Sequence, residues 1–108
     1  MQMRRTLLRG LVLAAALLLP LGAAAQAQEL SVTIDNFTFS PPELKVKVGD
    51  TVTWTNHDDI PHTVVSAGKY RSKTLDTDDK FSFTFTSAGD YKYFCSLHPH
   101  MTGMIKVE

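Results

Sequence analysis

Two patterns meet near the C-terminus in the stretch Tyr91-Lys92-Tyr93-Phe94-Cys95-Ser96-Leu97-His98-Pro99-His100-Met101. Its first half is aromatic and is expected to form a strand, while its second half is a short loop that contains a proline. In that loop Cys95, His98 and Met101 recur at three-residue intervals. Thiolate and thioether sulfur mixed with imidazole suits copper, which cycles between Cu(I) and Cu(II). The stretch therefore predicts a β-strand protein that holds a metal ion at the end of a strand.

A second histidine must complete such a site, because the loop places only His98 at ligand spacing. A cysteine and two histidines with a long axial methionine form the blue-copper arrangement. The best second histidine is His62, in Ile60-Pro61-His62-Thr63-Val64. Each residue alone also has an ordinary structural reading, since a single cysteine is often just a buried small side chain. We predict surface positions for the remaining histidines, His57 and His100.

The N-terminus has the features of an export signal. A basic start at Arg4, Arg5 and Arg9 precedes an apolar run from Leu11 to Leu19 and the small-x-small site Ala25-Gln26-Ala27. This predicts a signal peptide over residues 1–27 and a mature domain over residues 28–108. Cleavage before Gln26, export through the twin-arginine route and an uncleaved membrane anchor are the alternatives. The apolar run is shorter than the roughly 20 residues that span a bilayer, so no stable membrane insertion is expected.

Charge, length and cysteine count limit the classes of protein to which this chain can belong. The chain of 108 residues has eleven basic and eleven acidic side chains. Removal of the three N-terminal arginines leaves eight against eleven, a net charge of −3 without the basic footprint of a nucleic-acid binder. About 80 residues make one small domain with a limited core. Its single cysteine, Cys95, cannot form an internal disulfide, and a bound metal would protect the lone thiol in an oxidising compartment.

The mature chain alternates apolar and polar residues almost throughout, which predicts an all-β fold of seven or eight short strands. A β-sandwich and a small barrel both fit this pattern. Residues 56–61 are expected to be a polar loop, and residues 67–79 a long loop with a helical turn. Aromatic side chains are expected in the core, namely Trp54, Phe81, Phe83 and Phe85. The expected strands cover residues 30–34 (with Phe37 and Phe39 continuing the pattern), 44–48, 51–55, 62–66, 81–85, 91–95 and 103–107.

Several motifs together resemble the cupredoxins, and the resemblance covers the whole mature chain. It implies a Greek-key β-sandwich with one type 1 copper ion, in which His62, Cys95 and His98 are strong ligands and Met101 is the weak axial ligand. The spacing Cys95-x-x-His98-x-x-Met101 is similar to that of the amicyanin group, next to the plastocyanin-like proteins. The other motifs are Phe39-x-Pro41, Val48-Gly49-Asp50-x-Val52-x-Trp54-x-Asn56, Pro61-His62 and Phe85-x-x-x-Gly89-x-Tyr91-x-Tyr93-x-Cys95.

The chain departs from the amicyanin pattern at two positions near the expected metal. Thr63 follows the first histidine where asparagine is usual, which removes the basis for carrying over a side-chain hydrogen bond between the two ligand loops. His100 replaces an aromatic residue inside the ligand loop and changes the surface that a partner would contact.

The resemblance implies a monomeric periplasmic electron shuttle. It would carry single electrons from a donor dehydrogenase to an acceptor cytochrome or oxidase. A periplasmic copper chaperone or buffer is the alternative, because the same ligands can hold and release Cu(I). An enzyme is not expected, since copper oxidases and nitrite reductases need a further copper site and the chain has only four histidines.

Overall fold

The structure, a computed structural model, describes residues 26–108. The predicted signal peptide therefore lies outside the described residues, apart from Gln26 and Ala27. Within the described part of the chain, no helix is long and apolar enough to cross a membrane.

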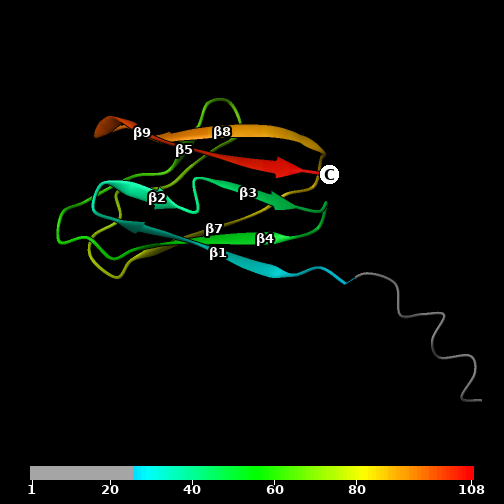
Figure 1. Ribbon diagram of the computed structural model, residues 1–108, viewed down its shortest axis with the longest axis horizontal. Helices are drawn as coiled ribbons and strands as arrows, with labels where there is room; N and C mark the ends of the chain where they lie inside the picture. The colour runs from blue at the N-terminus through cyan, green and yellow to red at the C-terminus, as the bar shows by residue number, and fades with distance from the viewer. Residues whose placement is uncertain (1–25) are drawn as a thin grey trace, which may run out of the picture.

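Two sheets face each other across an apolar core, and Figure 1 shows them as two layers. The first sheet has the order β2-β1-β4-β7 and the second the order β3-β9-β8-β5-β6. Each sheet contains one parallel pair, β1 with β4 and β3 with β9, which arises because the chain crosses between the sheets. The strands are β1 (Glu29–Asp35), β2 (Thr38–Ser40), β3 (Glu43–Val46), β4 (Thr51–Asn56), β5 (Val65–Ser66), β6 (Tyr70–Arg71), β7 (Lys80–Thr84), β8 (Gly89–Cys95) and β9 (His98–Val107).

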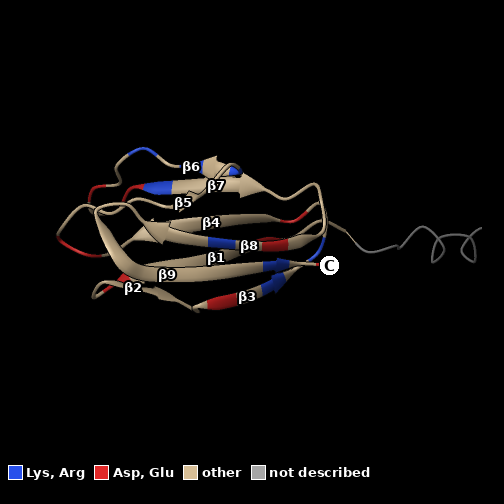
Figure 2. Cartoon of the chain, turned by 90° about the horizontal axis from the view of Figure 1, so that it is seen from above, with Lys and Arg blue, Asp and Glu red and all other residues tan. Residues whose placement is uncertain are grey.

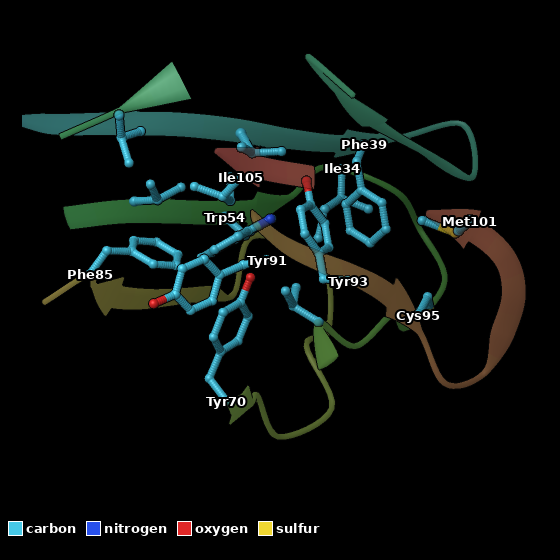
Figure 3. Close-up of a cluster of buried hydrophobic side chains, with 14 of the residues drawn as sticks. Ile34, Phe39, Trp54, Tyr70, Phe85, Tyr91, Tyr93, Cys95, Met101 and Ile105 are labelled. Atoms are coloured by element: carbon cyan, nitrogen blue, oxygen red, sulfur yellow. The ribbon is translucent and has the colours of Figure 1, made fainter. Parts of the chain in front are cut away.

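The core lies between the inner faces of the sheets. Trp54 on β4 is fully buried and packs against Tyr93 of β8, with ring centroids 5.4 Å apart. Ile34, Phe39 and Ile105 are buried in the same cluster (Figure 3). Burying this apolar surface is the main driving force for folding, and it fixes each strand's register because a slip of one residue would turn its apolar side chains outward.

The all-β Greek-key sandwich is confirmed, and several expected boundaries differ. The part of the chain that the structure describes forms nine strands instead of seven or eight. The long loop contains β6 and has no helical turn within residues 67–79. Val48 was expected in a half-buried strand but is exposed, because β3 ends at Val46 and the Asp50 carboxylate accepts the Lys47 N–H to form a turn. Phe81 and Phe83 are half-buried because β7 is an edge strand.

The region expected to supply the ligands also differs in detail. Only Val65 and Ser66 form the strand expected over residues 62–66, and His62 lies before it in an isolated bridge with Leu75. The loop after Cys95 is a two-residue turn, so that β9 begins at His98 and includes Met101. Figure 1 shows this turn at the end of the sandwich opposite the C-terminus, beside the loops that follow β4 and precede β7.

Candidate metal centre

The β8–β9 hairpin positions three of the four predicted ligands. Cys95 ends β8 and pairs with His98, the first residue of β9. The register shifts between Phe94 and Cys95, while the Cys95 side chain continues the inward alternation of Tyr91 and Tyr93 along β8. Cys95 and Met101 are both buried and lie at the same end of the core (Figure 3).

His62 is held by a second segment, between β4 and β5. Its backbone N–H donates to the Leu75 carbonyl at 3.1 Å, and the Leu75 N–H donates back to the His62 carbonyl at 2.8 Å. Asn56, fully buried at the end of β4, donates from its amide nitrogen to the carbonyls of Ile60 and Leu75 at 3.0 and 2.9 Å. These bonds fix the backbone on both sides of the fully buried His62 imidazole.

The two histidines and the cysteine converge on one point. The Nδ1 atom of His62 lies 3.7 Å from the Cys95 Sγ, and the Nδ1 atom of His98 lies 3.6 Å from it. The three ligand atoms lie within 4.8 Å of one another. Such separations suit ligands that share one metal ion at bond lengths of about 2.0 Å to nitrogen and about 2.3 Å to sulfur. His98 is the half-buried member of the group, so its ring edge reaches toward solvent.

Thr63 connects the two ligand segments directly. Its Oγ1 accepts a hydrogen bond from the Ser96 N–H at 2.7 Å and lies 2.7 Å from the Ser96 Oγ. The Thr63 N–H donates to the Cys95 Sγ at 3.3 Å, which stabilises a thiolate at that position. Thr63 stands where asparagine is usual in the amicyanin pattern. A hydrogen bond between the two ligand segments is nevertheless present, and the shorter threonine side chain makes it.

The far side of the His62 ring contacts Asp58. The His62 Nε2 lies 2.7 Å from the Asp58 Oδ2, a distance at which Nε2–H donates to the carboxylate. Removal of Asp58 from water raises its pKa, but the N–H groups of Phe37 and Asn36 and the His62 ring outweigh this and lower the pKa to about 2. Asp58 is therefore ionised at neutral pH. An Nε2–H donor leaves the Nδ1 lone pair of His62 free for a metal.

The donor set fits copper. Cys95 is buried, accepts a backbone N–H and faces two imidazole nitrogens, while a buried thioether lies at the same end of the core. One thiolate, two imidazoles and a weak methionine form the trigonal set that copper takes for electron transfer. Of the other histidines, His57 is exposed with its Nδ1 4.0 Å from the Asp78 Oδ1, and His100 is exposed on β9, so neither joins the cluster.

Sequence reasoning missed three residues that shape this site: Phe37, Asp58 and Asn56. Phe37 was grouped with a strand but is 49% exposed in the β1–β2 turn, where its ring packs against both ligand imidazoles. Asp58 lies four residues before His62, a spacing that could have identified it as a carboxylate partner of a ligand histidine. Asn56 carried no signal beyond its place in a motif.

Comparisons with known proteins agree with this geometry. The Cupredoxin-like domain family model matches residues 8–107. The amicyanin of Paracoccus denitrificans is 37% identical over 94 residues, covering 80% of this chain and 72% of the relative. The chloroplastic plastocyanin of Tetradesmus obliquus is 33% identical over 93 residues, covering 74% and 63%.

A solved amicyanin variant in its Cu(I) form superposes with a TM-score of 0.71 at 36% identity, covering 82% of this chain and 88% of that one. The shared fold and the convergence of His62, Cys95 and His98 agree with the type 1 copper site that the sequence predicts. The chain therefore belongs to the cupredoxin family of type 1 copper electron-transfer proteins.

Proposed function

We propose that the protein is a periplasmic one-electron carrier in which His62, Cys95 and His98 are the strong copper ligands and Met101 is the weak axial ligand. The convergence of the ligand atoms of the first three within 4.8 Å carries this proposal. A bound copper ion supplies the reversible Cu(I)/Cu(II) couple, with the thiolate bond giving the intense colour.

The scaffold supports rapid electron transfer because the ligands are held by rigid elements. His62 is fixed by two backbone hydrogen bonds to Leu75, and Cys95 by the β8–β9 ladder and the Thr63 N–H. Ligands that do not move when the oxidation state changes keep the reorganisation energy low. The proposed ligands all come from protein side chains, which suits a carrier better than an enzyme that needs an open metal position for substrate.

The surface around the site favours a partner with a basic face. Acidic residues lie in the loops after β4 and before β7, at the same end of the sandwich as the β8–β9 turn (Figure 2). The exposed residues Asp76 and Asp78 carry this charge. We expect a donor dehydrogenase and an acceptor cytochrome or oxidase to dock here, with association rates that fall as ionic strength rises.

The copper chaperone or buffer remains the second candidate. It would use the same ligands to hold Cu(I) and pass it on. His98 is half-buried, so it is the ligand at which another protein could take over the metal, and this favours a chaperone. The fully buried His62 and the buried Cys95 instead favour retention of the metal.

The test is the visible and electron paramagnetic resonance spectrum of the exported protein after addition of Cu(II). An electron carrier will show intense, persistent colour that disappears on reduction and returns on oxidation. In Cys95→Ser the colour should be lost while the circular dichroism of the sandwich remains. A colourless wild type that binds only Cu(I) and releases it to an acceptor would refute the electron-carrier proposal and support the chaperone.

A further inference from the structure

We propose that Asp58 is a positioning residue of the metal centre. Its single carboxylate orients the His62 imidazole and, through the β1–β2 turn, holds the Phe37 ring against both ligand histidines. This inference rests on the proposed copper site. It adds that Asp58 helps to set the balance between Cu(II) and Cu(I) at that site. Asp58 is not one of the predicted ligands.

The first step is the contact with His62. The Asp58 Oδ2 lies 2.7 Å from the His62 Nε2, on the side of the ring opposite the Nδ1 that faces the Cys95 Sγ. The imidazole is fully buried and the Asp58 side chain is only 11% exposed, so water does not compete strongly for this bond. The carboxylate thereby selects the tautomer with a bare Nδ1 and makes that nitrogen a stronger donor.

The second step is the contact with the turn between β1 and β2. The Asp58 Oδ1 accepts the Asn36 N–H at 2.6 Å, and its Oδ2 accepts the Phe37 N–H at 3.0 Å. Both turn residues are left-handed, with φ of 51° and 59°. A phenylalanine rarely adopts this conformation, so the turn needs compensating interactions. Two hydrogen bonds to one ionised carboxylate provide them.

The strained turn places the Phe37 ring at the metal centre. The Phe37 ring lies edge-on to His62, with centroids 5.6 Å apart, and edge-on to His98, with centroids 5.0 Å apart. Phe37 thus covers both imidazoles from one side and limits rotation of the half-buried His98 ring. Asp58 therefore acts on His62 directly and on His98 through Phe37.

The consequence concerns the balance between Cu(II) and Cu(I). A negative carboxylate bonded to a ligand imidazole stabilises Cu(II) more than Cu(I), because the ion with the higher charge gains more from a strong, anionic donor environment. Removal of the hydrogen-bond partner of a ligand histidine usually lowers metal affinity by about 10- to 100-fold. Loss of the Asp58 carboxylate should lower the affinity for Cu(II) by this amount and the affinity for Cu(I) by less. A tenfold change in the ratio of the two affinities raises the reduction potential by about 59 mV.

The experiment compares Asp58→Asn with Asp59→Asn in the full chain. Both variants remove one negative charge from adjacent positions, but Asp59 is exposed on the surface. Voltammetry should show a raised potential for Asp58→Asn and a value near that of the wild type for Asp59→Asn. The visible and paramagnetic spectra of Asp58→Asn should also change, because the His62 ring is freed to reorient. Equal shifts in the two variants, or no shift in either, would overturn the proposal.

A measurement without copper separates this proposal from the proposed function. Nitrogen NMR of the His62 ring in the metal-free wild type should show the Nε2–H tautomer, and Asp58→Asn should lose that strict preference. This test also decides the matter if Asp58→Asn does not fold, because an Nδ1–H tautomer in the wild type alone refutes the orienting role. A wild type with the Nε2–H tautomer that never becomes blue would refute the electron-carrier proposal and leave the Asp58–His62 contact established.

Discussion

Replacement of Thr63 by valine tests whether its hydroxyl joins the two ligand segments. Valine keeps the β-branched shape at this buried position and removes only Oγ1. Two contacts at 2.7 Å are lost, from the Ser96 N–H and to the Ser96 Oγ. A typical hydrogen bond contributes about 0.5–1.5 kcal/mol to stability, which gives roughly 1–3 kcal/mol for the pair. Because Ser96 is exposed and water can reach its freed groups, we expect about 1–2 kcal/mol.

The assay is thermal unfolding of the metal-free protein, where a bound ion does not complicate the transition. For a domain of this size each kcal/mol lowers Tm by about 4–8 °C, so Thr63→Val should unfold roughly 4–16 °C below the wild type. Ser96→Ala should cost about half as much, because the Ser96 N–H can still donate to Thr63. Thr33→Val on β1 is the matched control, since it makes the same chemical change away from the ligand segments. A Thr63→Val variant as stable as the control would refute this role for the hydroxyl.

Three further predictions address other parts of the molecule. Met101→Leu should keep copper and colour but raise the reduction potential by about 60 mV or more, since loss of the weak axial donor disfavours Cu(II); loss of the copper would make Met101 a principal ligand. Gly103→Ala should destabilise the fold by at least about 1–3 kcal/mol in denaturant titration, because the added Cβ would lie within 3 Å of three side-chain atoms of the buried Tyr93; wild-type stability would contradict that packing. Folding lowers the pKa of Asp58 to about 2 and also lowers the pKa of Asp50. The stability that both carboxylates provide above about pH 4 should therefore fall as the pH drops toward 2. Asp50→Asn should flatten this pH dependence in unfolding curves of the metal-free protein.

The sequence by itself determined the strand content and the identity of the four candidate ligands. Alternation of apolar and polar residues is a local property, so it predicted β1, β4 and β8 close to their observed bounds. The spacing from Cys95 to Met101 is also local. It could be recognised without knowledge of the fold, because a short hairpin holds all three side chains.

Only the tertiary structure decided what surrounds those ligands. Asp58 accepts hydrogen bonds from Asn36 and Phe37, which are 22 and 21 residues away in the chain, and Thr63 bonds to Ser96 across 33 residues. No local pattern encodes such contacts, since they depend on which loops meet at one end of the sandwich. The exposure of Val48 and the half-burial of Phe81 and Phe83 were missed for the same reason. Alternation shows that a strand has two faces, but only strand order shows where the strand ends and whether a neighbour covers its apolar face.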